Sequence, residues 1–181
     1  MSPESRDRVV QQPLPSAAIG DLVAELVGKS DLVWVQPEGL PARPVWSVWH
    51  DDAIAVVTDG LEQPNPGLAD GAEVTVIVRS KDNRARQVSV RATTEQLVAG
   101  SQAWDTAAAV LHPQRLNAPD GEKQLERWAS SSVIWLLRPG EPVEQPGSYS
   151  TDAERAEPLP TSATTSTRVP FHAGRATKKR R

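Results

Sequence analysis

The sequence predicts a mostly β domain, a small antiparallel barrel or sandwich with flanking helices, on three observations. Segments between residues 43 and 91 alternate apolar and polar side chains with the period of two that half-buried strands show. Short turns separate these segments, so neighbouring strands are expected to pair antiparallel. Helical periodicity appears before and after this stretch. Strands and helices in this order favour a closed or nearly closed sheet with helices covering it.

The first elements are a helix and two strands. Ser16 is a suitable N-cap, apolar residues recur at one-turn spacing from Ile19 to Leu26, and Gly28 ends the run. This pattern predicts an amphipathic helix of about three turns. Strands are expected at residues 32–36 and 44–50.

The strand at 44–50 carries tryptophan on both faces, because Trp46 and Trp49 are three residues apart. Asp51 and Asp52 then form a two-residue hairpin loop into a strand at 53–58. Residues 59–71 contain Pro64 and Pro66, which cannot donate to a ladder or continue a helix. This segment is therefore predicted to leave the sheet as an irregular crossover.

The clearest hairpin pairs residues 72–80 with 84–92, each with its valines on one face and with a turn at 81–83. A helix follows at 101–112, with Trp104, Ala108 and Leu111 on one side. A short helix near 122–128 and a last strand at 132–138, ended by Pro139 and Gly140, complete the predicted order.

Composition divides the chain into a flexible N-terminus (residues 1–15), one domain (16–144) and a basic, disordered C-terminal tail (145–181) that is rich in Pro, Ser and Thr. Residues 1–144 carry 13 Lys and Arg against 20 Asp and Glu, whereas residues 145–181 carry 7 against 3. An acidic domain makes nucleic acid an unlikely partner. The basic run that ends the tail is predicted to be a flexible, solubilising end, which could also fold back onto the domain.

The chain has no cysteine, and this excludes disulfides, thiolate catalysis and Cys-ligated metals. No apolar run reaches the roughly 20 residues that span a bilayer, and the N-terminus lacks the apolar core of a signal peptide. The sequence therefore predicts a cytoplasmic protein that does not associate with a membrane. His50, His112 and His172 lie far apart, so no metal site is predicted.

No catalytic residue is predicted, because the chain has no GxSxG, P-loop or GxGxxG motif. Among the six tryptophans, Trp34, Trp104 and Trp135 match apolar faces and are predicted to be core residues. Trp46 and Trp49 fit a core or a ligand site equally well.

Basic side chains cluster on the central hairpin. They either blunt a sheet edge as solvated charges or hold a phosphate or carboxylate. The cluster comprises Arg79, Lys81, Arg84, Arg86 and Arg91.

The order helix, strand, PVWSVWHDDAIAVVT, crossover, AEVTVIVRS hairpin, Trp-containing helix and VIWLLRPGEP resembles the flavin-nucleotide-binding split barrels related to pyridoxamine 5′-phosphate oxidase. It is most similar to their actinobacterial branches, some of which use a deazaflavin coenzyme. The resemblance covers about residues 16–144. It implies a Greek-key-like split β-barrel with flanking helices, FMN or a deazaflavin as cofactor, and a homodimer whose crevice lies between subunits.

The resemblance implies cofactor-binding roles for Trp46, Trp49, Thr58 and Arg79. Members typically follow the Thr at the end of the third strand with a basic segment that holds the cofactor phosphate. Thr58 matches, but Pro64 and Pro66 stand at the basic positions and the segment carries Glu62 and Asp70. A phosphate there would lack a neutralising cation from the same loop. Either Arg79 or an Arg from a second subunit substitutes, or the cofactor has been lost.

Two interpretations of function remain open at this point. The first is a flavin- or deazaflavin-dependent oxidoreductase acting on a small molecule, in which the cofactor supplies the hydride chemistry. The second is a non-catalytic split-barrel protein that has lost the cofactor phosphate site and binds a small molecule or a protein partner.

Overall fold

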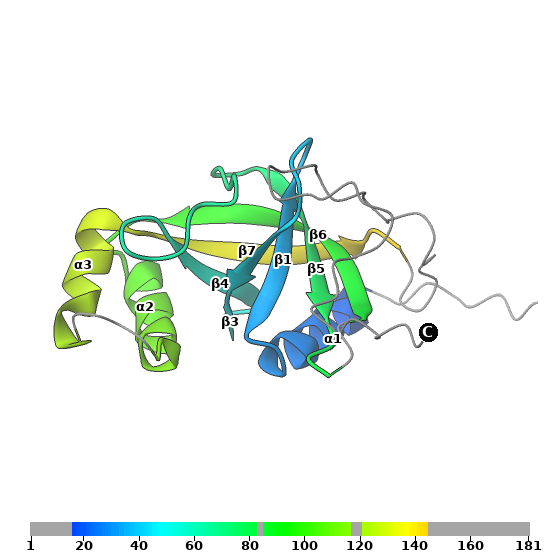
Figure 1. The fold of residues 1–181 in the computed structure, drawn as a ribbon, viewed down its shortest axis with the longest axis horizontal. Helices are drawn as coiled ribbons and strands as arrows, with labels where there is room; N and C mark the ends of the chain where they lie inside the picture. Colours follow the sequence, from blue (N-terminus) through cyan, green and yellow to red (C-terminus); the bar gives the residue numbers. More distant parts are fainter. Residues whose placement is uncertain (1–15, 83–84, 117–120, 145–181) are drawn as a thin grey trace, which may run out of the picture. The chain divides into compact units, whose positions relative to one another are not determined.

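The computed structural model describes residues 16–82, 85–116 and 121–144, and this part of the chain is a mostly antiparallel split β-barrel with flanking helices, as predicted (Figure 1). Its one seven-stranded sheet has the order β2-β1-β5-β6-β7-β4-β3. The strands are β1 (Leu32–Pro37), β2 (Arg43–Trp46), β3 (Val48–His50), β4 (Ala53–Thr58), β5 (Glu73–Arg79), β6 (Arg86–Leu97) and β7 (Val133–Pro142).

The split in the barrel lies between β2 and β3, which stand at opposite ends of the sheet although they are consecutive in the chain. The sequence predicted one strand at 44–50, and this was wrong, because the ladder breaks at Ser47. β2 pairs with β1 and β3 pairs with β4, so the chain changes partner at this corner. The Asp51–Asp52 hairpin loop is confirmed, and both residues have the positive φ that such a loop requires.

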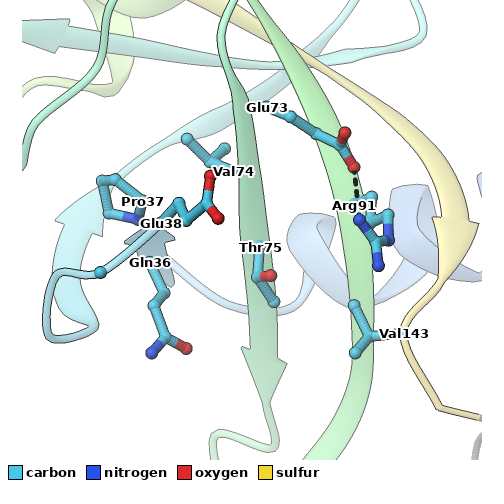
Figure 2. Close-up of a pocket in the computed structure, with 9 residues that line it drawn as sticks. Gln36, Pro37, Glu38, Glu73, Val74, Thr75, Arg91 and Val143 are labelled. Carbon is cyan, nitrogen blue, oxygen red and sulfur yellow. Dashed lines mark hydrogen bonds and ion pairs between the residues drawn. The ribbon is translucent and has the colours of Figure 1, made fainter.

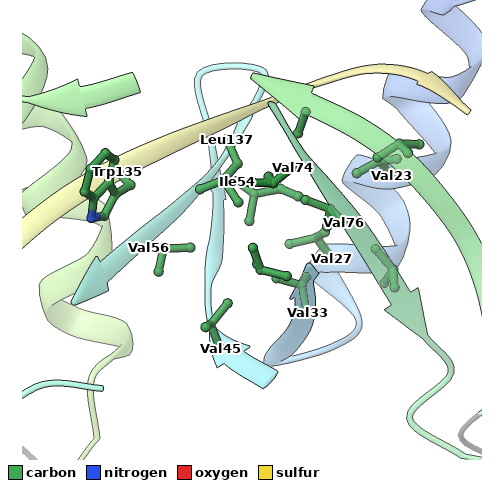
Figure 3. Close-up of a cluster of buried hydrophobic side chains, with 14 of the residues drawn as sticks. Val23, Val27, Val33, Val45, Ile54, Val56, Val74, Val76, Trp135 and Leu137 are labelled. Carbon is green, nitrogen blue, oxygen red and sulfur yellow. The ribbon is translucent and has the colours of Figure 1, made fainter. Parts of the chain in front are cut away.

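The barrel interior is filled by a first hydrophobic cluster (Figure 3). Inward-facing valines of β1, β5 and β6 meet Ile54 and Val56 of β4 and Leu137 of β7. Helix α1 (Ser16–Gly28) closes the cluster with Ile19, Val23 and Val27, which are at most 3 % exposed. The predicted amphipathic helix and its apolar face are therefore confirmed.

A second cluster packs helices against the other face of β4 and β7. Helix α2 (Gln102–Gln114) begins at the N-cap Ser101, and α3 (Gln124–Ser131) follows a 3₁₀ turn at Gly121–Lys123. Figure 1 shows the two helices together beside one end of β7 and β4. All six residues of β4 are buried, because this strand is covered on both faces. Trp104 and Trp128 are core residues of this cluster.

The predicted β5–β6 hairpin is confirmed, and it pairs Val74 with Ala92, Val76 with Val90 and Val78 with Val88. The predicted strand ends were wrong, because β6 continues to Leu97 and β7 continues through Pro142. A register shift between Val90 and Ala92 accommodates the prolines of β7, which cannot donate to a regular ladder.

Among the tryptophans predicted to be core residues, Trp104 and Trp135 are confirmed, at 6 % and 3 % exposed. Trp34 was predicted wrongly. Its neighbours Val33 and Val35 point into the barrel, so the alternation of the strand turns Trp34 outward, where it is half-buried.

The predicted flexible N-terminus, the disordered tail and part of the turn at 81–83 lie outside the described residues. No helix among residues 16–82, 85–116 and 121–144 combines the length and apolar character needed to cross a membrane.

Candidate ligand-binding groove

The four residues predicted to bind a cofactor do not gather around one cavity. Thr58 is fully buried, and its hydroxyl donates to Asp59 Oδ2 at 2.8 Å while accepting from Trp135 Nε1 at 3.0 Å. A hydroxyl engaged in this way has a structural role and does not face a ligand. The sequence prediction for Thr58 therefore finds no support in its surroundings.

Trp46 and Trp49 are both half-buried, on opposite sides of the sheet as predicted. Trp46 packs against the second cluster and Trp49 against the first. The guanidinium of Arg115 lies 5.8 Å from the centroid of the Trp46 ring and covers it. Both tryptophan rings therefore pack against other residues of this chain.

The crossover between β4 and β5 bridges β2 and β4, two strands that approach each other where the barrel is split. We call this place the seam of the barrel. The side-chain amide of Gln63 accepts from the Trp46 N–H at 2.7 Å and donates to the carbonyls of Trp46 and Val57 at 2.9 and 3.0 Å. It thereby joins β2 to β4, which do not pair directly. Further along, Asn65 Oδ1 accepts from the backbone of Gly67 and Leu68, and Asp70 Oδ1 accepts from the Gln96 N–H.

Glu62, in the same crossover, does not face an open phosphate site as the sequence suggested. Its side chain is 2 % exposed and accepts from Arg115, Arg127 and Trp128 at 2.8 to 3.0 Å. Burial alone would raise the pKa of this carboxyl, but the hydrogen bonds from Trp128, Arg115 and Arg127 outweigh it and hold the pKa below the usual range of glutamate. Sequence reasoning missed this cluster, because its donors lie 53 to 66 residues away and no local pattern connects them.

Arg79, by contrast, lines an open cavity of about 390 Å³. Its guanidinium stands 4.8 Å from the centroid of the outward-facing Trp34 ring. We call this cavity the Trp34–Arg79 groove; it lies between the start of β1 and the end of β5 and is lined by Ser30, Asp31, Leu32, Trp34, Arg79, Ser80 and Lys81.

The groove combines apolar surface with charged side chains. Leu32 is 49 % exposed and Trp34 is half-buried, so both present apolar surface. Lys81 approaches Asp31 at 3.4 Å, but both side chains are largely exposed and such a pair is weak. A second cavity of about 270 Å³ shares Arg79 and Lys81 with the groove. It extends towards Leu26 of α1 and towards Lys29, which follows that helix.

The other basic residues of the hairpin are paired with acids. Arg91 donates to Glu73 at 3.0 Å, and these two residues face each other in a cavity of about 360 Å³ further along the same face (Figure 2). Arg86 lies 3.8 Å from Glu144. β5 and β6 are central strands, so these side chains do not blunt a sheet edge. Arg84 lies outside the described residues.

Within the described ranges, no group of three His, Asp or Glu side chains is arranged to hold a metal ion. The groove offers exposed apolar surface, the guanidinium of Arg79 over Trp34, and the side chains of Lys81 and Asp31.

Comparison with known proteins gives structural likeness only. No protein-family model matches the chain, and no curated protein matches it. Among solved structures it is similar to HutZ, the heme storage protein from Vibrio cholerae, with a TM-score of 0.50 and 10 % identity over 67 % of this chain and 89 % of that one. The flavocytochrome Anf3 from Azotobacter vinelandii aligns with a TM-score of 0.38 and 16 % identity over 84 % and 86 % of the two chains. The likeness to HutZ supports the split-barrel fold.

Proposed function

We propose that this protein is a small-molecule-binding split barrel that holds a planar, anionic ligand in the Trp34–Arg79 groove. The observation that carries the proposal is the guanidinium of Arg79 over the ring of Trp34 at the edge of an open cavity. In the described part of the chain, no carboxylate lies within ion-pair distance of Arg79, whereas Arg86, Arg91 and Arg138 each have one.

The groove suits such a ligand on three grounds. A flat ring can stack on the guanidinium plane of Arg79, which itself lies over the ring of Trp34. A phosphate or carboxylate can take a forked pair of N–H donors from Arg79 and a point charge from Lys81. The volume of about 390 Å³ lies within the usual range for small-molecule sites.

The resemblance stated from the sequence and the name of HutZ suggest which ligands to test. FMN and deazaflavin coenzymes are planar and carry phosphate, and haem is planar and carries carboxylates. All three share the ring and the negative charge that the groove is equipped to recognise. In this proposal Arg79 takes the role of the missing basic loop, while the crossover, residues 59–71, takes no part in binding.

Of the two interpretations left open by the sequence, ligand binding without catalysis is the one we propose. An oxidoreductase activity would require the ligand to be a flavin or a deazaflavin, which would supply the hydride chemistry. The residues of this chain would then bind and orient the ring.

The proposal includes a homodimer formed through the outer face of β1, β5 and β6, which no helix of the described part of the chain covers. Leu32 and Val143 are exposed on this face, at 49 % and 44 %. A second copy of the chain would bury them and would narrow the groove from outside.

Equilibrium dialysis with FMN, and separately with haemin, tests the proposal. At least one of the two is expected to bind with micromolar affinity. Arg79→Ala should weaken that affinity about tenfold or more, because a charge-assisted hydrogen bond is lost. Trp34→Ala should also weaken it, because the Arg79 guanidinium would lose the ring over which it lies.

Arg91→Ala is the matched control, since it removes an arginine from the same face of the sheet but outside the groove. It should leave the affinity unchanged. Binding that is equally weakened by Arg79→Ala and Arg91→Ala would show only general charge attraction, and the absence of binding to both probes would contradict the proposed ligand class.

A further inference from the structure

A cluster of three side chains lies away from the groove, and each donates a hydrogen bond to the buried carboxylate of Glu62. Arg115 Nε donates to Glu62 Oε2 at 2.8 Å, and Arg127 Nη2 and Trp128 Nε1 donate to Oε1 at 3.0 and 2.9 Å. We propose that Arg115, Arg127 and Trp128 form a carboxylate-binding site whose resident ligand is the chain's own Glu62, and that this internal ligand latches the crossover over the barrel seam.

The donor set recognises a planar anion that only accepts hydrogen bonds. Guanidinium and indole groups have no acceptor, so they cannot satisfy one another. A carboxylate has two oxygens in one plane and can take several donors at once, with each bond strengthened by charge. A neutral side-chain amide in the same place would point its NH₂ group at the guanidinium and indole N–H groups, which cannot accept a hydrogen bond.

The donors are held in place by contacts that do not involve Glu62. Trp128 is fully buried in the second cluster and meets the ring of His112 edge-on, with 6.4 Å between centroids. Arg115 lies over the Trp46 ring, and the Arg127 side chain is 13 % exposed. Because the site is largely preorganised, little ordering is needed when a carboxylate enters it.

Glu62 itself belongs to no helix or strand, so its three side-chain hydrogen bonds help to fix where the start of the crossover lies. The adjacent residue Gln63 bonds the backbone of Trp46 and Val57 and thereby closes the seam between β2 and β4. A turn in which the Glu62 N–H donates to the Asp59 carbonyl connects this segment to the end of β4. Occupation of the site by Glu62 therefore places the Gln63 amide in the seam.

Thermal unfolding of Glu62→Ala, with and without a small carboxylate, tests the latch. The substitution should lower Tm by about 10 °C or more, because it removes the acceptor of the buried Trp128 indole N–H and a carboxylate that bonds two partly buried arginines. Acetate at about 100 mM should restore part of this loss by binding the vacated site, and chloride at equal ionic strength should restore less. The effect should be partial, because a tethered carboxylate has a much higher effective concentration than a free one.

Two variants serve as controls. Glu73→Ala removes an exposed carboxylate that also pairs with an arginine, and acetate should not stabilise it more than it stabilises the unaltered protein. Glu62→Gln keeps the site filled with a side chain of the same shape, so it should lose stability without being rescued by acetate.

Acetate should also restore the crossover, seen as renewed protection of the Trp46 amide from hydrogen exchange. The proposal is overturned if Glu62→Ala remains unfolded when refolded in acetate. It is equally overturned if acetate stabilises Glu62→Ala no more than Glu73→Ala, or stabilises Glu62→Gln as strongly as Glu62→Ala.

Discussion

Thr58 and Glu62 are buried polar residues at the start of the crossover, and internal hydrogen bonds account for both. The Thr58 hydroxyl has one donor and one acceptor partner, and the Glu62 carboxylate has three donors. Buried polar groups that are satisfied in this way stabilise the fold, and their loss leaves partners unsatisfied. Substitutions here should therefore change stability and leave the affinity for a groove ligand unchanged.

Thr58→Val should lower the free energy of unfolding by about 1 to 3 kcal/mol, because it leaves the indole N–H of Trp135 buried without its acceptor. Denaturation by urea measures the loss. The double variant Thr58→Val, Trp135→Phe should cost less than the sum of the two single changes, since the phenyl ring has no N–H to satisfy. Unchanged stability together with weakened ligand binding would restore the cofactor-binding role predicted for Thr58.

Glu62 should also make the fold sensitive to acid. Its folded-state pKa is depressed, so its contribution to stability is fully present above the unfolded pKa of about 4.3 and is lost as pH falls through the folded value. The unaltered protein should thus lose more stability below about pH 4 than Glu62→Gln, which has no proton to gain there. Parallel pH profiles of the two proteins would contradict this account.

At the scale of the elements, local patterns predicted the structure well wherever neighbouring residues decide it. Alternating valines showed which faces of β5 and β6 are buried, and the one-turn spacing from Ile19 to Leu26 predicted the apolar face of α1. The break at Ser47 could not be predicted, because both halves of 43–50 have strand character and the change of partner depends on where the distant strands β1 and β4 lie.

The candidate site was predicted less well, for a related reason. Arg79 was identified from its charge and side-chain chemistry, which the sequence displays. Trp34 was assigned to the core, because alternation within a strand shows two faces but does not show which one is inside. The partners of Glu62 come from α3 and from the residue after α2, and only the folded chain brings these segments to the crossover.

Gly60 is a specific requirement of the crossover. It has φ +63°, and a Cβ added there would lie 2.7 Å from the backbone oxygen of Ser131. Gly60→Ala should therefore cost more than the roughly 1 kcal/mol expected of left-handed strain alone. Gly71→Ala is the matched control, because Gly71 has φ +71° with nothing within 4 Å of the added atom. Equal losses in urea denaturation would show that the contact with Ser131 relaxes freely.

At the scale of the whole molecule, no helix among residues 16–82, 85–116 and 121–144 covers the outer face of β1 and β5. α1 completes the interior, and α2 with α3 covers the outer face of β4 and β7. The outer face of β1 and β5 instead carries Trp34, Arg79 and the exposed Leu32. This asymmetry is what directs both the proposed ligand and the proposed second subunit to the same face.

The homodimer predicts a mass twice that of the 19.6 kDa chain in light scattering at micromolar concentration. Val143→Asp should shift the protein towards monomer, because it places a charge on an exposed apolar position of the proposed interface. Leu61→Asp is the control, since Leu61 is exposed in the crossover and lies off this face. A monomer at these concentrations would contradict the interface.

The most direct test of the ligand-binding groove is the absorption spectrum of the protein purified from its native host. A flavin, a deazaflavin or a haem absorbs at wavelengths where tryptophan does not. The account predicts such a band in the unaltered protein and in Arg91→Ala, and its loss or strong reduction in Arg79→Ala. A spectrum with tryptophan absorption alone, or a ligand band that Arg79→Ala leaves unchanged, would contradict it.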